Sequence, residues 1–142
     1  MTSSTLVSTD LLAAHLREWT VIDCQFDLQR EAQGLADYRA RHVPGAVFAS
    51  VAHDLSGAKT GRNGRHPMPA LEVFLVTVRR LGISPDRQVV VYDQDSGLFA
   101  SRLWWMLRAA GHPAAAMLDG GLAKWVAEGR PTTGGDEVNA PG

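Results

Sequence analysis

The fold is decided by the stretch Gln88-Val89-Val90-Val91-Tyr92-Asp93-Gln94-Asp95-Ser96-Gly97-Leu98. Three consecutive valines and a tyrosine predict a strand that is buried on both faces, as strands of parallel sheets are. The polar run from Asp93 to Leu98 predicts a loop at the end of that strand. A helix is expected next, from Phe99 to Ala110, because its apolar residues recur at helical spacing and Gly111 can end it.

Strands and helices alternate on both sides of this stretch. Short buried strands are expected at Val21–Ile22, Val47–Phe48 and Ala114–Leu118. Helices are expected from Asp10 to Leu16 behind a Ser8 or Thr9 cap, from Leu71 to Leu81, and from Leu122 to Val126. Residues 25–41 are expected to be polar and irregular, and residues 53–68, with several glycines and basic side chains, to form an exposed loop.

This alternation predicts an α/β fold with a mostly parallel central sheet and helices on both faces. Ligand sites in such sheets lie beyond the carboxyl ends of the strands. The loop that follows Tyr92 is therefore the first candidate position for a functional site.

Composition narrows the function classes. The chain has 142 residues, the size of one domain, and its formal net charge of −1 does not favour nucleic acid or anionic lipid as a partner. No apolar run reaches the roughly 18 residues of a membrane span. The first residues lack the pattern of a signal peptide, so we expect a cytoplasmic location. One cysteine and five scattered histidines predict neither a disulfide nor a metal site. No nucleotide-binding glycine motif is present, so no cofactor is expected.

Four motifs in this order resemble the rhodanese superfamily. They are His42-Val43-Pro44-Gly45-Ala46, Val89-Val90-Val91-Tyr92-Asp93, Arg102-Leu103-Trp104-Trp105-Met106 and Leu118-Asp119-Gly120-Gly121-Leu122-Ala123-Lys124-Trp125. More narrowly, the chain is similar to the N-terminal domain of tandem thiosulfate and 3-mercaptopyruvate sulfurtransferases. A rhodanese-like domain is expected over residues 1–130, with an interdomain linker or tail over residues 131–142.

The resemblance implies a function for the whole family. Its members move a sulfane sulfur to an acceptor through a persulfide on a cysteine at the head of the loop after the central strand. That cysteine lies in the C-terminal domain, whereas the first domain has an emptied loop and covers the active-site cleft. The expected partner is therefore the C-terminal catalytic rhodanese domain of the same protein.

The residues of the loop after Tyr92 agree with the interpretation that this chain is such a first domain. A sulfur-accepting cysteine needs thiolate character, which backbone N–H groups, a helix N-terminus or cations supply. Asp93 stands at the head of the loop Asp93-Gln94-Asp95-Ser96-Gly97-Leu98. A carboxylate there cannot carry sulfur and repels an incoming anion. The chain alone is expected to be inactive.

Cys24 is the one other candidate nucleophile. It follows the strand at Val21–Ile22, so it lies near the same edge of the sheet. No Gly-rich or cationic loop follows it, and Asp23 and Asp27 flank it, which favours an inert, partly buried cysteine. A weak sulfurtransferase that works through Cys24 is the alternative.

Several residues are candidates for a surface that faces the partner domain. They are His66, Arg62, Arg65 and Arg102. His66 lies in the segment His66-Pro67-Met68-Pro69, which matches a segment proposed to face the partner's active site in mercaptopyruvate-type relatives. The aspartate that would act with it does not match, because its place falls at Ala52 and Asp54 is out of register. The arginines can hold an anionic substrate.

The remaining motif residues are expected to be structural. This set comprises His42, Pro44, Gly45, Asp119, Gly120, Gly121 and Trp125. Gly45 suits a tight turn, and Asp119 is expected to accept amides at the start of the last helix. Because adjacent tryptophans cannot share one helical face, one of Trp104 and Trp105 can pack on the sheet while the other meets a partner. A stand-alone inactive module that binds a protein or small anion remains the alternative to the two-domain enzyme.

Overall fold

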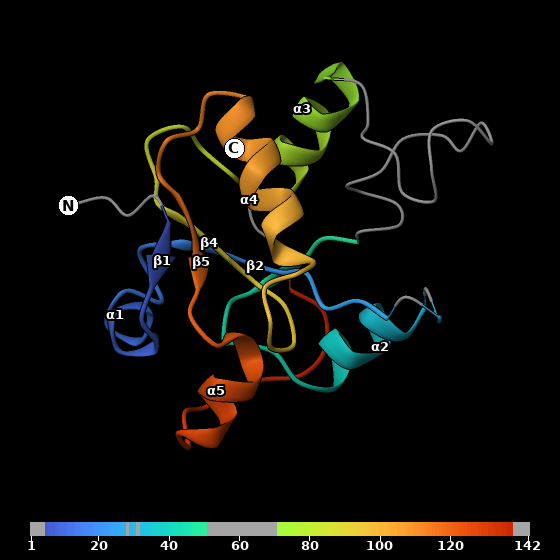
Figure 1. Cartoon of the computed structure of the whole chain (residues 1–142), viewed down its shortest axis with the longest axis vertical. Helices are drawn as coiled ribbons and strands as arrows, with labels where there is room; N and C mark the ends of the chain where they lie inside the picture. Colours follow the sequence, from blue (N-terminus) through green and yellow to red (C-terminus); the bar gives the residue numbers. More distant parts are fainter. Residues whose placement is uncertain (1–4, 28, 31, 51–70, 138–142) are drawn as a thin grey trace.

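The computed structural model describes residues 5–27, 29, 30, 32–50 and 71–137, and a five-stranded sheet lies at its centre (Figure 1). The strands are β1 (Leu6–Val7), β2 (Thr20–Asp23), β3 (Val47–Phe48), β4 (Val89–Tyr92) and β5 (Ala115–Leu118). Their order is β1-β5-β4-β2-β3, and all four ladders are parallel. The predicted parallel α/β sheet is confirmed.

The valine strand β4 is the centre of this sheet. It pairs with β2 from Thr20–Val89 to Asp23–Tyr92 and with β5 on its other side. No residue of β4 is more than 1% exposed. Side chains alternate between the two faces, so Val89 and Val91 join one core cluster while Val90 and Tyr92 join the other.

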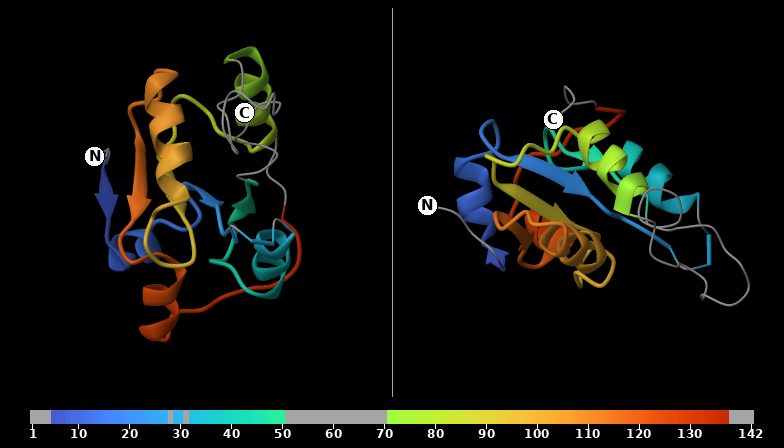
Figure 2. Two further views of the ribbon diagram at one scale, coloured as in Figure 1. Left: turned by 45° about the vertical axis from the view of Figure 1, so that its right-hand side comes forward. Right: turned by 90° about the horizontal axis from the view of Figure 1, so that it is seen from above.

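Helices cover both faces of the sheet (Figures 1 and 2). They are α1 (Thr9–Ala14), α2 (Gln33–Ala40), α3 (Leu71–Arg80), α4 (Ala100–Ala109) and α5 (Gly121–Ala127). Phe74 of α3 and Leu103 of α4 pack into one cluster. Leu12 of α1 and Trp125 of α5 pack into the other. No helix among the described residues is long and apolar enough to cross a membrane.

Two elements differ from the sequence predictions. The short edge strand β1 was not expected, and residues 25–41, expected to be irregular, contain α2. This helix carries no apolar stripe, since only Gly34 and Tyr38 are buried in it. It is held by tertiary contacts instead: the Tyr38 hydroxyl donates to the carbonyl of Ala46 at 2.6 Å.

A glycine fixes the approach of α2 to the rest of the domain. A Cβ atom added at Gly34 would lie 2.3 Å from the carbonyl oxygen of Gln25, a backbone atom that cannot turn aside. We therefore expect Gly34→Ala to lower the free energy of unfolding by about 2 kcal/mol or more, although alanine is the better helix former. Urea unfolding measures the change. The exposed Ala36→Ser of the same helix is the control and should cost only a few tenths of a kcal/mol; an equal loss in both variants contradicts the close-contact argument.

Candidate functional site

The loop after β4 is organised around the carboxylate of Asp93, which is fully buried. One carboxylate oxygen accepts the backbone N–H groups of Asp95 at 3.1 Å and Gly97 at 3.0 Å. The other accepts those of Phe99 at 2.9 Å and Ala100 at 3.0 Å. Four inward-pointing amides thus enclose one anionic side chain.

Part of this enclosure is the beginning of α4. Phe99 is the residue before the helix and Ala100 is its first residue. The first amides of a helix have no partner within the helix and favour a negative charge. The loop is therefore an anion cradle by construction, and its own Asp93 occupies it. Asp95, by contrast, is exposed, and its carboxylate accepts the backbone N–H of the adjacent Ser96.

Helix α5 supports the loop from outside. Its first amides donate to loop carbonyls: Leu122 to Asp93 at 3.0 Å and Ala123 to Gln94 at 2.8 Å. A Cβ atom at Gly121 would lie 2.8 Å from the Asp93 carbonyl oxygen, so glycine permits this approach. The expectation that Asp119 caps α5 is wrong, because the helix has no side-chain cap; Asp119 instead lies 3.5 Å from the ammonium of Lys124.

Gln94 ties the loop to a distant segment, a role that sequence reasoning did not assign. Its amide nitrogen donates to the carbonyl of Phe26 at 2.7 Å, and its amide oxygen accepts the N–H of Phe26 at 3.3 Å. The side-chain amide of Gln94 thus bonds both backbone groups of Phe26, as a residue of a neighbouring strand would. No periodicity marks such a bond, since its partners are 68 residues apart.

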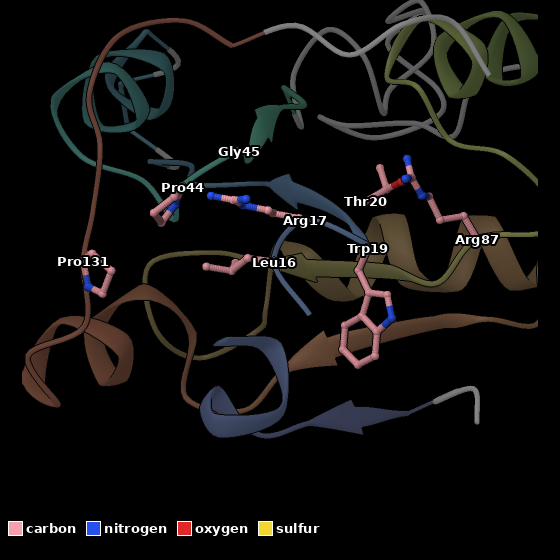
Figure 3. A pocket seen from close by; sticks show the side chains of 8 residues that line it. All are labelled: Leu16, Arg17, Trp19, Thr20, Pro44, Gly45, Arg87 and Pro131. Atoms are coloured by element: carbon pink, nitrogen blue, oxygen red, sulfur yellow. The ribbon is translucent and has the colours of Figure 1, made fainter. Parts of the chain in front are cut away.

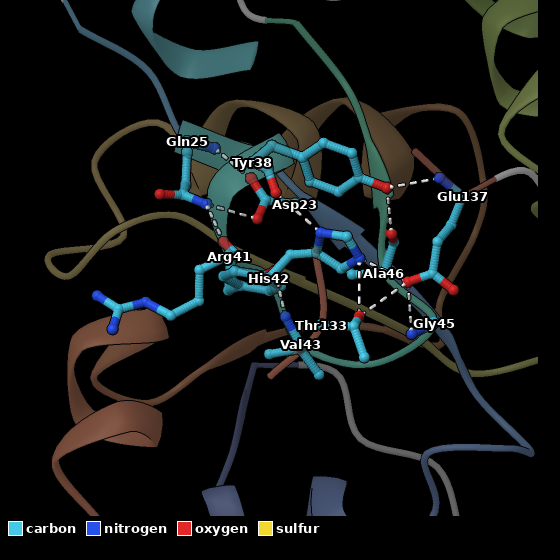
Figure 4. A network of polar contacts seen from close by, with 11 residues as sticks. Asp23, Gln25, Tyr38, Arg41, His42, Val43, Gly45, Ala46, Thr133 and Glu137 are labelled. Atoms are coloured by element: carbon cyan, nitrogen blue, oxygen red, sulfur yellow. Dashed lines mark hydrogen bonds and ion pairs between the residues drawn. The ribbon is translucent and has the colours of Figure 1, made fainter. Parts of the chain in front are cut away.

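A buried polar network lies beside the loop, where β2 ends (Figure 4). The carboxylate of Asp23 is fully buried and accepts from the backbone N–H of Gln25 at 2.9 Å and from its side-chain amide at 2.8 Å. The Tyr92 hydroxyl, which also bonds this carboxylate, accepts the N–H of Val43 at 3.0 Å. Burial raises the pKa of Asp23 to about 6 despite these bonds. Burial also raises the pKa of Tyr92 well above its usual value.

The turn motif of residues 42–46 adjoins this network. His42 is fully buried and stacks on the ring of Tyr38 at 4.2 Å between centroids. Its Nδ1 lies 2.8 Å from the Tyr38 carbonyl and its Nε2 lies 2.5 Å from a carboxylate oxygen of Glu137. Gly45 has φ +84°, the left-handed conformation of a tight turn. Pro44 lines a neighbouring hollow.

The two tryptophan positions of α4 divide as the sequence suggested. Trp104 packs against the core cluster, whereas 57% of Trp105 is exposed. Leu98, at the end of the loop, is 65% exposed.

Arg102 is half-buried, and desolvation lowers its pKa. Trp125 is fully buried and its indole N–H donates to the carbonyl of Pro131 at 2.7 Å. His66, Arg62, Arg65, Ala52 and Asp54 lie outside the described residues.

Cys24 lies inside the apolar core rather than at the surface of the sheet edge. The residue is fully buried and belongs to the same apolar cluster as Ile22 and Phe26. Its backbone N–H donates to the carbonyl of Tyr92 at 2.7 Å, which extends the β2–β4 ladder by one bond. Burial among apolar groups disfavours the thiolate form that nucleophilic attack requires.

A separate hollow of about 530 Å³ lies beside the amino end of β2 (Figure 3). Its lining residues come from four segments of the chain: Leu16, Arg17, Trp19, Thr20, Pro44, Gly45, Arg87 and Pro131. The Thr20 hydroxyl is the only buried side-chain polar atom within the described residues that has no hydrogen-bond partner. Within that same part of the chain, no group of three potential ligands could hold a metal ion.

The Asp93 enclosure yields a stability prediction. In Asp93→Asn the amide nitrogen must face two of the four N–H donors whichever way it turns, so two donors lose their acceptor at a side chain that is fully buried. We expect a loss of about 2 to 4 kcal/mol in the free energy of unfolding. Asp95→Asn, in the same loop but exposed, should change it by less than about 0.5 kcal/mol. Chemical denaturation of the two variants measures the difference, and a mild effect at Asp93 would refute the role given to its carboxylate.

The raised pKa of Asp23 yields a pH prediction. Between the unfolded pKa of 3.8 and the folded pKa of about 6, the folded protein holds a proton that the unfolded chain has lost. The contribution of Asp23 to stability is therefore fully present below about pH 4 and is lost as the pH rises through 6. Its size is about 3 kcal/mol.

Asp23→Asn isolates this contribution because its side chain does not titrate. The difference in unfolding free energy between wild type and variant should shift by roughly 3 kcal/mol against the wild type from pH 4 to pH 7. Denaturant titrations across that range measure it. Carboxylates with lowered pKa, such as Glu128 and Asp136, have the opposite pH dependence and cancel in the difference. A difference that stays constant with pH would show that Asp23 titrates normally.

Comparisons with known proteins agree with the fold described above. The family model of the rhodanese-like domain matches residues 8–128. A probable 3-mercaptopyruvate sulfurtransferase of Pseudomonas aeruginosa is 40% identical over 146 residues, which cover 100% of this chain and 51% of that protein. The human 3-mercaptopyruvate sulfurtransferase is 39% identical over 107 residues, which cover 74% of this chain and 35% of that protein.

Solved structures show the same likeness. SseA from Escherichia coli, described as a 3-mercaptopyruvate sulfotransferase, superposes with a TM-score of 0.85 at 33% identity and covers 99% of this chain and 54% of its own. The 3-mercaptopyruvate sulfurtransferase from Leishmania major superposes with a TM-score of 0.88 at 29% identity, over 97% of this chain and 38% of its own. The chain thus spans about half the length of these relatives or less. It belongs to the rhodanese-like domain family and is homologous to thiosulfate and 3-mercaptopyruvate sulfurtransferases.

Proposed function

We propose that this chain is the non-catalytic rhodanese-like domain of a two-domain thiosulfate or 3-mercaptopyruvate sulfurtransferase. One observation carries the proposal: the carboxylate of Asp93 occupies the amide cradle at the head of the loop after β4. In a rhodanese domain that transfers sulfur, this is the place of the cysteine that becomes a persulfide.

The chemistry of sulfur transfer explains why Asp93 cannot take over that role. A thiolate must attack the outer sulfur of thiosulfate or the single sulfur of 3-mercaptopyruvate and form a new S–S bond. The S–S bond of thiosulfate or the C–S bond of 3-mercaptopyruvate breaks, and sulfite or the enolate of pyruvate leaves with the electron pair. The carboxylate oxygens of Asp93 form no such bond, and the four amides that would stabilise a persulfide anion are already taken by them. The negative charge of Asp93 also opposes the approach of an anionic donor.

Cys24 does not supply the missing thiolate in this proposal. Its side chain is fully buried in the apolar cluster behind the sheet, so a donor cannot reach it without local unfolding. No helix N-terminus lies at this position, because Cys24 follows β2 within a stretch that leads to Gln25 and Phe26.

The second domain would supply the catalytic loop. The relatives in the comparisons are about twice as long as this chain, or longer, which leaves room for another domain. In this arrangement the exposed side chains near the Asp93 loop, Leu98 and Trp105, would cover one side of the cleft between the domains. The domain would then shape access of the donor rather than react with it. A cytoplasmic location remains part of the proposal.

A sulfur-transfer assay tests the proposal. With thiosulfate or 3-mercaptopyruvate as donor and cyanide as acceptor, we expect no thiocyanate above the blank from this chain. The longest natural reading frame that contains it should be active with one of the two donors.

The controls separate the alternatives. Cys24→Ala should leave both results unchanged. Turnover by the chain alone that disappears in Cys24→Ala would establish Cys24 as the nucleophile and overturn the proposal. A natural stop codon at residue 142, together with an inactive chain, would favour a stand-alone module that binds a protein or small anion through the surface around Leu98 and Trp105.

A further inference from the structure

The segment of residues 131–137, called the strap below, crosses from the end of α5 to the turn at residues 42–45. In Figure 1 the strap is the red trace that runs from α5 past α2. Thr133 exchanges two backbone hydrogen bonds with His42, at 2.8 and 2.9 Å, and Gly135 donates to the carbonyl of Arg39 at 2.8 Å. The strap is therefore bound along its length to a segment about 90 residues earlier in the chain.

Glu137 makes the most concentrated set of these contacts (Figure 4). One of its carboxylate oxygens lies 2.5 Å from Nε2 of His42, 3.0 Å from the N–H of Gly45 and 3.3 Å from the hydroxyl of Thr133. The backbone N–H of Glu137 donates to the hydroxyl of Tyr38 at 3.2 Å. Both the main chain and the side chain of Glu137 are thus fixed by hydrogen bonds.

Both ring nitrogens of His42 have a partner. Nδ1 faces the carbonyl of Tyr38, which can only accept, so Nδ1 carries a hydrogen. Nε2 lies 2.5 Å from the Glu137 carboxylate and 3.1 Å from the hydroxyl of Thr133. Because His42 is fully buried, no water can replace Glu137 there without a rearrangement of the turn, and loss of this partner would leave a buried polar atom poorly satisfied.

The neighbouring ion pair of the strap has a different character. Asp136 pairs with Arg39 at 2.8 Å, and the two side chains are 59% and 54% exposed. Solvent screens such surface pairs, which contribute little. Of these two side-chain contacts of the strap, the one between Glu137 and His42 therefore adds most to its backbone hydrogen bonds.

We propose that Glu137, clamped by buried His42, is a positioning residue that fixes where the second domain joins this one. This inference rests on the proposed two-domain function. A released strap would free seven residues, about 25 Å of extended chain. A longer free linker lowers the effective concentration of one domain at the other, so the cleft between them would form less often.

Hydrogen exchange of this chain tests the clamp itself. In Glu137→Gln the amide cannot satisfy His42, Gly45 and Thr133 together. We expect the amides of Thr133, Gly135 and Glu137 to exchange about 10- to 100-fold faster than in the wild type. Asp136→Asn, one residue away, should leave them within about twofold. The β4 amides report global stability. Equal exchange in both variants would overturn the clamp.

The natural two-domain protein tests the positioning role. We expect Glu137→Gln to broaden the distribution of distances between spin labels on the two domains and to lower kcat/KM about tenfold, with Asp136→Asn unchanged. The alkylation rate of the catalytic cysteine should not change, since its own domain is untouched. A faster-exchanging strap with unaltered distances and kcat/KM would refute positioning. A reading frame without a catalytic second domain would refute the proposed function, while the exchange experiment would still decide the clamp.

Discussion

The carboxylate of Asp93 is the constraint on which the functional end of this domain depends. Four backbone N–H groups converge on the carboxylate of Asp93, which is fully buried. Each of them would cost free energy if it were buried without a partner. The side chain of Asp93 satisfies all four at once, and it joins the end of the central strand to the first turn of α4. The loop conformation and the start of α4 both follow from this single group.

The second half of this constraint comes from outside the loop. Helix α5 places its first amides on the carbonyls of Asp93 and Gln94, and Gly121 allows the close approach. The first N–H groups of α5 and the carbonyl groups of the Asp93 loop thus satisfy one another by hydrogen bonds. This explains why the glycine pair before Leu122 accompanies the loop in the sequence, although 26 residues separate Asp93 from Asp119.

Sequence reasoning reached the parts of the fold that local patterns encode. The three valines of β4, the helical spacing of α3 and α4, and the loop at Asp93 are each legible over a few residues, and the structure has them at those places. Helix α2 was missed because its stability comes from Tyr38 and Gly34, which contact other segments, rather than from an apolar stripe. Strand β1 was missed because two residues give no period to detect.

The candidate site was predictable to a similar extent. The position of Asp93 at a strand end was visible in the sequence, but its four amide partners depend on the path of the loop. Gln94 bonds to Phe26, 68 residues away, and Glu137 bonds to His42 and Gly45, 92 or more residues away, so no spacing rule could have found these contacts. The cap assigned to Asp119 failed for a related reason: a tertiary acceptor had taken the amides that a local side chain usually satisfies.

A loop that directs four N–H groups inward requires an anion at its head, whatever chemistry the domain performs. Under the proposed function, a thiolate or a persulfide would meet this requirement in the catalytic domain, whereas an aspartate meets it here with a charge of the same sign. A serine or an alanine would leave donors without a partner, and a longer glutamate would not fit a space set by bonds of 2.9 to 3.1 Å. Under the proposed function, loss of the nucleophile and retention of the fold are therefore compatible at this position because Asp93 replaces the charge without replacing the sulfur.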